Sequence, residues 1–154
     1  MIQRIQSVYL LLSAICSIAC LSLPVGRYVS DGLLSATMYN LWIASAADGS
    51  RMLSSAPLFV ILLLAAAVSL YTIFIYKNRK QQIRLSSFSS LLIVGWYVVY
   101  AAIAMLCGGA DAGGAVFSPS VYGALPAAAL ILNLMASRAI RADERLVRAA
   151  DRIR

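Results

Sequence analysis

Five polar residues inside long apolar runs are the side chains most able to do chemistry or to line a path through the protein. They are Ser13, Ser17, Tyr97, Tyr100 and Asn133. Their hydroxyl and amide groups donate and accept hydrogen bonds, but none of them changes charge near neutral pH. Such groups suit close helix packing or a neutral polar path better than acid-base catalysis. Ser13 and Ser17 are four residues apart and so share one helix face. Asn133 is the amide deepest in an apolar run, and we expect it to form an interhelical hydrogen bond.

The residue types that catalysis and metal binding need are missing or badly placed. The 154-residue chain has no histidine, and its six Asp and Glu residues all lie outside the apolar runs. Neither a Ser-His pair nor a pair of carboxylates can be assembled inside these runs. The cysteines, Cys16, Cys20 and Cys107, form no Cys-x-x-Cys pair and read as small packing residues. We therefore expect no enzymatic activity, no cofactor and no metal.

A second group of candidate residues lies at the C-terminus, where arginines recur beside an apolar stripe at helical spacing. These candidates for lipid or partner contact are Arg138, Arg141, Arg145, Arg148 and Arg152. A basic amphipathic helix can lie on anionic lipid or dock on a partner. A solvated tail that only fixes the orientation of the chain is the alternative.

Four apolar runs must position these residues. The chain is 62% apolar and 12% charged, with a mean hydropathy of +0.84, whereas soluble proteins average about 25% charged residues. The runs cover about 5–23, 57–76, 88–107 and 119–137, and a helix of about 20 residues spans a bilayer core. The sequence therefore predicts an all-α membrane protein, a single four-transmembrane-helix bundle.

The charges predict the orientation of the bundle. The turn at 77–84 carries four cations, and all but two of the 13 Lys and Arg residues fall at the termini or in this turn. Positive charge favours the cytoplasmic side. We therefore expect both termini inside (N-in/C-in), a cytoplasmic basic tail at 138–154 and a multi-pass location in the cell inner membrane. The net charge of +7 follows from this topology and does not indicate a nucleic-acid partner.

The first external loop, 24–56, is long enough for a small structure of its own. Asp31 and Gly32 form a weak hairpin signal between two β-prone segments. The run 37–43 has strand composition but also suits an interfacial helix. We expect a small β-hairpin or sheet cap and keep the interfacial helix as the alternative.

The second external loop, 108–117, is rich in glycine and reads as a flexible linker. Ser118 and Pro119 would follow it as the N-cap and first-turn proline of the fourth span. Pro126 would then lie inside that helix and kink it.

Three segments carry a family resemblance. They are MIQRIQSVYLLL at the start, IYKNRKQQIRL at 75–85, and ALILN followed by the arginine-rich end. Together they resemble a family of small four-pass Bacteroidota membrane proteins, the domain of unknown function 4293. The resemblance covers the whole chain and implies a four-helix inner-membrane protein. It implies no catalytic or binding residues.

These observations favour a non-enzymatic scaffold or accessory subunit of a membrane complex, because charged relays inside the spans are absent. Its partners would be membrane lipids and a membrane protein or a second copy of the chain. The alternative is a small oligomeric transporter or channel subunit, in which the five polar residues line a neutral path.

Overall fold

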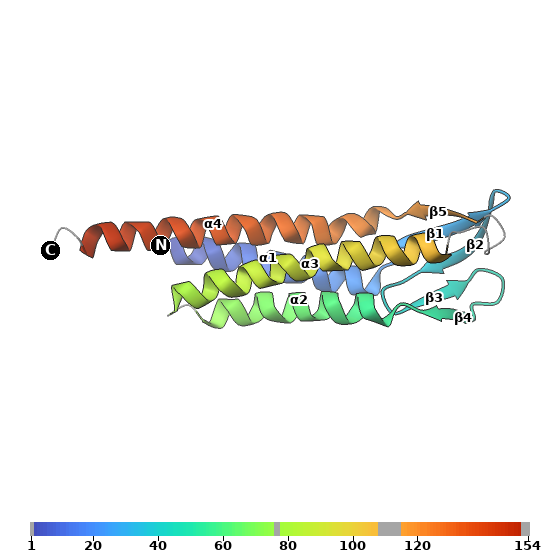
Figure 1. Cartoon of the computed structure of the whole chain (residues 1–154), viewed down its shortest axis with the longest axis horizontal. Helices are drawn as coiled ribbons and strands as arrows, with labels where there is room; N and C mark the ends of the chain where they lie inside the picture. Colours follow the sequence, from blue (N-terminus) through green and yellow to red (C-terminus); the bar gives the residue numbers. More distant parts are fainter. Residues whose placement is uncertain (1, 76–77, 108–114, 152–154) are drawn as a thin grey trace.

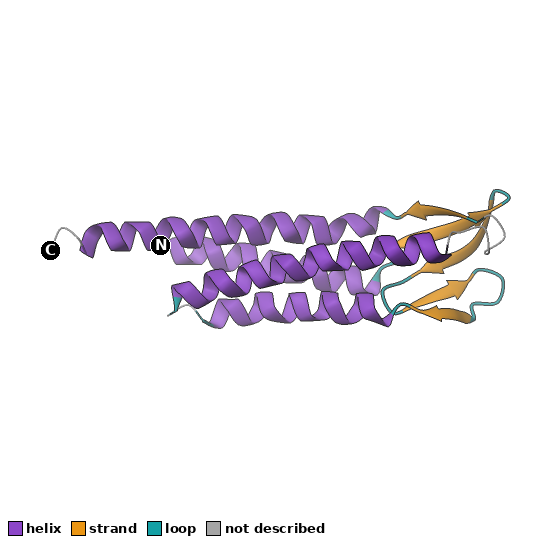
Figure 2. Cartoon of the chain, in the orientation of Figure 1, coloured by secondary structure: helices purple, strands orange, loops and turns teal. Residues whose placement is uncertain are grey.

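The computed structural model describes residues 2–75, 78–107 and 115–151, and shows a long four-helix bundle with an antiparallel sheet at one end. Figures 1 and 2 show all strands gathered at the end where α1 finishes and α4 begins. The chain is mostly helical, about 70%, but it is not all-α. The predicted cap is therefore a real second layer, and the fold class is a helical bundle with a small sheet.

Each helix grows from one of the apolar runs. The helices are α1 (Ile2–Ser22), α2 (Ala56–Phe74), α3 (Arg79–Cys107) and α4 (Leu125–Asp151). At 1.5 Å per residue they are about 29 to 44 Å long, against a hydrocarbon core of about 30 Å. All four are long and apolar enough to cross a membrane. The longer helices, α3 and α4, exceed the thickness of such a core.

The helices pack in a ring in which α1 contacts α2 and α4, and α3 contacts the same two helices from the other side. Small side chains fill the contact lines. Those that are fully or almost fully buried are Ala14, Ala65, Ala66, Ala129 and Ala136. Lipid tails offer no hydrophobic drive for helix association, so close approach at small residues supplies the packing energy. Large aliphatic side chains are mostly exposed on the outer surface.

The cap is a five-stranded antiparallel sheet with the order β4-β3-β2-β1-β5. Its strands are β1 (Gly26–Ser30), β2 (Leu33–Met38), β3 (Trp42–Ser45), β4 (Arg51–Ser54) and β5 (Val116–Pro119). The β1–β2 turn confirms the Asp31-Gly32 signal, because both residues have positive φ, 51° and 78°, as a type I′ hairpin requires. Gly49, with φ of 68°, turns the chain from β3 into β4.

Residues 37–43 form neither a single strand nor an interfacial helix. β2 ends at Met38 and β3 begins at Trp42, and Tyr39 N donates to Trp42 O across the tight turn between them. The β-prone composition does produce strand at both ends of this run. The chain reversal at Asn40 has no Gly or Pro to mark it in the sequence. Tertiary contacts of Asn40, described below, fix this turn.

The second outer loop also differs from its prediction. Residues 108–114 of the predicted linker lie outside the described residues. Its last two residues, 116 and 117, belong to strand β5, which pairs with β1 and brings Pro119 opposite Gly26. Ser118 and Pro119 therefore do not start a helix. A 3-10 helix, η2 (Val121–Ala124), leads into α4 at Leu125, so the fourth helix begins later than 119. Pro126 lies in its first turn, where a missing N–H is tolerated, and the predicted mid-helix kink is wrong.

Asn40 joins the cap to the bundle. It is fully buried, its Nδ2 donates to the Cys20 carbonyl at 2.6 Å, and its Oδ1 accepts from Trp96 Nε1 at 3.0 Å. The Cys20 carbonyl belongs to the last turn of α1, where backbone acceptors lack helical partners. One side chain therefore connects the sheet to both α1 and α3.

We predict that Asn40→Ala lowers the thermal unfolding midpoint of the purified protein by about 3–10 °C. The substitution leaves the buried indole N–H of Trp96 without its partner. It also removes one of the two bonds to the Cys20 carbonyl, which still accepts from Leu23 N at 3.3 Å. Such losses cost about 1–3 kcal/mol. The measurement is a thermal melt in detergent. Asn78→Ala, at an exposed asparagine with one 3.3 Å bond to Gln81, is the control. Equal midpoints for the two variants would contradict the role given to Asn40.

Candidate functional site

Aromatic side chains gather where the bundle meets the cap. Trp96 stacks on Tyr100 with ring centroids 5.0 Å apart and planes 9° apart, and it meets Tyr97 edge-on. Phe117 of β5 contacts the rings of Tyr100 and Tyr28. Aromatic pairs of this kind add about 0.5–1.5 kcal/mol beyond their buried area. The cluster connects α3 to β1 and β5, two neighbouring strands of the sheet.

Tyr97 and Tyr100, the two tyrosines among the predicted polar residues, each donate a hydrogen bond to a backbone carbonyl at this junction. Tyr97 donates to Gly123 O at 2.8 Å, and Tyr100 donates to Val25 O at 2.7 Å. The acceptors lie where the chain enters β1 and where it leaves β5 for α4. The tyrosine hydroxyls thus satisfy irregular backbone near the end of the helices, as backbone in an apolar setting requires. Gly26 permits this packing, since a Cβ there would overlap the Phe117 ring.

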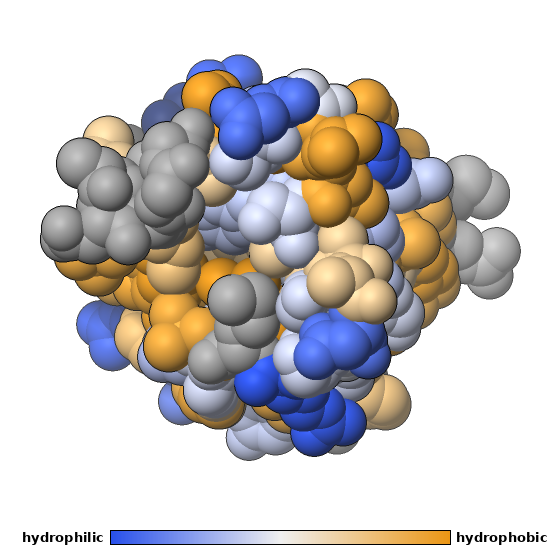
Figure 3. Space-filling model, turned by 90° about the vertical axis from the view of Figure 1, so that its right-hand side faces the viewer, coloured by the Kyte–Doolittle hydropathy of each residue, from blue (hydrophilic) through white to orange (hydrophobic). Residues whose placement is uncertain are grey.

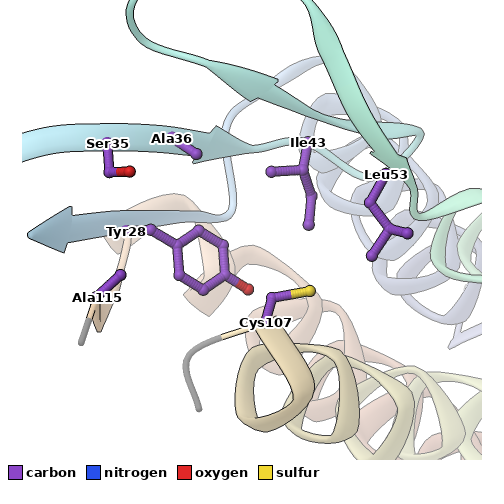
Figure 4. A pocket seen from close by; sticks show the side chains of 7 residues that line it. All are labelled: Tyr28, Ser35, Ala36, Ile43, Leu53, Cys107 and Ala115. Atoms are coloured by element: carbon purple, nitrogen blue, oxygen red, sulfur yellow. The ribbon is translucent and has the colours of Figure 1, made fainter. Parts of the chain in front are cut away.

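A cavity of about 460 Å³ lies between the sheet and the end of α3. Figure 4 shows Tyr28 and Cys107 pointing toward each other on one side, with Ile43 and Leu53 projecting from β3 and β4 on the other. Small-molecule sites have volumes of about 300–1,000 Å³ and mainly apolar walls with few polar groups. Figure 3, which looks onto the cap end, shows hydrophobic surface reaching the middle of this face, with hydrophilic residues around it.

The polar side chains of the cavity are the phenol of Tyr28, the thiol of Cys107 and the hydroxyl of Ser35. Burial raises the pKa of Tyr28, and the neighbouring Cys107 adds to the shift. Tyr28 therefore stays neutral, and its hydroxyl donates weakly to Met38 Sδ at 3.9 Å. In the described part of the chain no three His, Cys, Asp or Glu side chains come together as metal ligands. The arrangement can hold an apolar group beside a neutral donor, and it offers no general base.

Comparison with known families decides what the chain is. The model of the domain of unknown function (DUF4293) matches residues 2–153, nearly the whole sequence. The chain belongs to this family. No curated protein matches it. The junction and the cavity therefore belong to a member of a family whose function is unknown.

A second cluster of polar residues lies inside the bundle of this family member. Asn133 Nδ2 donates to Ser89 Oγ at 3.0 Å and to Ser69 Oγ at 3.4 Å, and the two hydroxyls are 2.8 Å apart. Ser89 also donates to the Ala65 carbonyl. The cluster joins α2, α3 and α4 and confirms the interhelical hydrogen bonding expected for Asn133. One turn further, Ser86 bonds both Asn133 O and Ser137 Oγ.

The two serines of α1 face inward as their spacing predicts. Ser13 Oγ donates to the Ala129 carbonyl of α4 at 3.0 Å, and Ser17 Oγ donates to Ser13 O within its own helix. Tyr97 and Tyr100 lie at the cap junction, whereas Ser13 and Asn133 lie deeper in the bundle. The structure therefore divides the five predicted residues between two places.

Two buried amide atoms lack partners among the described residues. They are Nε2 of Gln6 and Oδ1 of Asn133, on side chains that are 3% and 0% exposed. Buried polar atoms are almost always hydrogen-bonded, so each orphan calls for an explanation. Sequence analysis missed Gln6 because it lies next to the charged N-terminus, where a polar residue is ordinary.

Arg138, Arg141 and Arg145 lie toward the C-terminal end of α4. All three are exposed, in keeping with lipid or partner contact. The side chain of Arg148 and the whole of Arg152 lie outside the described residues. Asp143 pairs instead with Arg79 at the start of α3, with Nη1 and Oδ2 2.8 Å apart, which fixes α4 against α3.

Serines within the apolar runs were the signal for the polar cluster. Ser69 of α2 and three serines of α3, Ser86, Ser89 and Ser90, are all almost fully buried. The i, i+3 and i+4 spacing of the three α3 serines could have marked an inward face. No comparable signal pointed to Asn40 or to the cavity. Both depend on how the sheet folds onto the helix ends.

Proposed function

We propose that this protein is a non-enzymatic scaffold or accessory subunit of a membrane complex that presents its cap to a partner outside the cytoplasm. It would be a multi-pass protein of the bacterial inner membrane with both termini inside. The distribution of charge supports this orientation: the cap end carries Arg27 and Arg51 beside Asp31 and Asp48, and the opposite end carries most of the cations.

The observation that carries the proposal is the way the cap is fastened. Asn40, Tyr97 and Tyr100 each bond a buried backbone carbonyl where the sheet meets the helices. A sheet held at this many points is a rigid surface, and rigid surfaces bind at a lower entropic cost. A protein that needed only to span the membrane would gain nothing from such an attachment.

The cavity supplies the contact that the proposal needs. Leu53 lines it and is half exposed, so an apolar group of a partner can reach the cavity without unfolding the sheet. Buried apolar anchors in pockets carry much of the energy of protein interfaces. The absence of a general base in this cavity supports binding rather than catalysis.

The orientation is tested by cysteine accessibility in spheroplasts. We expect a membrane-impermeant maleimide to label Asp48→Cys, in the exposed β3–β4 turn, from outside. Leu146→Cys, exposed on α4, should be labelled only after lysis. Both variants carry Cys107→Ser as well, because Cys107 lines the open cavity at the cap end. Cys20, which is fully buried, serves as an internal unlabelled site. If only Leu146→Cys is labelled in intact spheroplasts, the topology is the opposite of the one proposed.

The partner is tested by a pull-down in mild detergent, read by mass spectrometry. We expect a co-purifying membrane protein whose yield falls at least several-fold for Leu53→Glu, because a carboxylate in the cavity mouth must be desolvated on binding. Leu33→Glu is the matched control, since Leu33 is exposed in the hairpin and does not line the cavity. If truncation after Leu146 abolishes co-purification of the partner, the contact lies in the basic tail instead of the cavity. A protein that purifies alone in every form would contradict the accessory role.

The second candidate function is a small oligomeric transporter or channel subunit with a neutral polar path. The unpartnered atoms of Gln6 and Asn133 favour it, because polar groups inside a membrane bundle are costly and often functional. Against it, the tyrosines of the predicted path are satisfied by backbone at the cap junction. The path would therefore consist of the serines and Asn133 alone.

Reconstituted liposomes distinguish this alternative. If Asn133 lines a path, Asn133→Leu should abolish the leak of small neutral solutes that the wild-type protein allows, and Ser87→Ala, at an exposed serine of α3, should not. A wild-type protein that passes no solute, or an unchanged rate in Asn133→Leu, rules out this path.

A further inference from the structure

We propose a binding site for one anionic phospholipid in the groove between α2 and α3 at the end of the bundle opposite the cap. The groove has a volume of about 300 Å³ and is lined by Tyr71, Ile75, Gln81, Arg84 and Leu85. Its polar members can meet a phosphate, and its aliphatic members can meet the first methylenes of the acyl chains. The partner proposed for the cap plays no part in this inference.

Arg84 supplies the charge. It is exposed, and within the described part of the chain it forms no ion pair, whereas Arg79 at the start of the same helix is paired with Asp143. A guanidinium is a planar donor that matches phosphate geometry and is weakly hydrated compared with an ammonium. Arg84 is therefore a free phosphate ligand, and Arg79 is not.

Gln81 is oriented to add a second donor. Its Oε1 accepts a hydrogen bond from Asn78 Nδ2 at 3.3 Å. Because the acceptor end of this amide is occupied, its Nε2 group remains to donate to an anion. Tyr71, which is 58% exposed on α2, offers a hydroxyl at the opposite wall.

The surface of α3 that follows Arg84 toward the middle of the bundle is apolar and fits acyl chains. Arg84, Phe88 and Leu91 follow i, i+4 and i+7 spacing and so share a face of α3. Phe88 and Leu91 are 51% and 66% exposed. A lipid whose phosphate lies on Arg84 would lay its chains along this face toward the middle of the bundle. An inorganic phosphate would use only the upper part of the site.

The walls of the groove are held together. Gln82, one residue from Gln81, is buried and its Nε2 donates to Thr72 O of α2 at 3.4 Å. Further along, Ser69 and Ser89 bond across the same pair of helices. The spacing between Tyr71 and Arg84 is thus set by buried contacts and does not depend on the ligand.

The test is native mass spectrometry of the purified full chain with added phosphatidylglycerol or phosphatidylcholine of identical acyl chains. We expect the wild-type protein to retain one phosphatidylglycerol in preference to phosphatidylcholine. Arg84→Gln should reduce this retention about fivefold, the effect of one cation at a membrane surface, and Arg84→Lys should restore part of it. Lys80→Gln removes one positive charge from an exposed site at the same end of α3 that does not line the groove, and it should retain the lipid.

Each other outcome overturns the site. Equal losses in Arg84→Gln and Lys80→Gln would show a diffuse basic surface instead of a groove. Equal retention of the two lipids would remove any role for headgroup charge. Displacement of phosphatidylglycerol by inorganic phosphate at equal concentration would show that the site takes a free anion and makes no use of the acyl chains. Circular dichroism of each variant verifies that the helices remain.

Discussion

The hydrogen bonds of the buried Asn40 amide hold together the two layers of this protein. The amide reaches the end of α1 and the indole of α3 at the same time, so it fixes both the turn between β2 and β3 and the height of the sheet above the helices. Hydrophobic contact alone would leave the sheet free to slide over the helix ends, because apolar contact has no preferred direction. The tyrosine bonds to Val25 and Gly123 act in the same way on the other side of the sheet.

The interior of the bundle follows the same rule with smaller groups. Alanines and serines let the helices approach, and hydroxyl groups bond across the contact lines in place of a hydrophobic drive. Asn133 joins three helices through Ser69 and Ser89. Such bonds contribute about 0.6 to 2 kcal/mol each in membranes, but they also select one register among several that apolar packing would allow.

The two ends of the bundle have different chemistry, which favours different contacts. The cap end has a neutral cavity with apolar walls, suited to an apolar group of a partner. The opposite end has exposed arginines, and Arg84, which forms no ion pair with any described residue, lines a groove between α2 and α3, suited to phosphate. The proposed scaffold, with a protein on one side and a lipid on the other, would use this asymmetry. Among the described residues, no three His, Cys, Asp or Glu side chains come together at either end as metal ligands.

The sequence by itself determined the four helices, the mostly helical class, the family and the hairpin at Asp31-Gly32, because apolar run length and turn residues are local properties. It also indicated that Asn133 bonds between helices, since an amide in an apolar run needs partners. Only the tertiary structure decided that residues 116–119 complete the sheet, that Asn40 is buried, and that a cavity forms under β3 and β4. Strand pairing between segments some 90 residues apart, such as Gly26 with Pro119, depends on where the helices place their ends. No local pattern carries that information, because the same glycine-rich loop would serve equally well as a linker if α3 and α4 ended elsewhere.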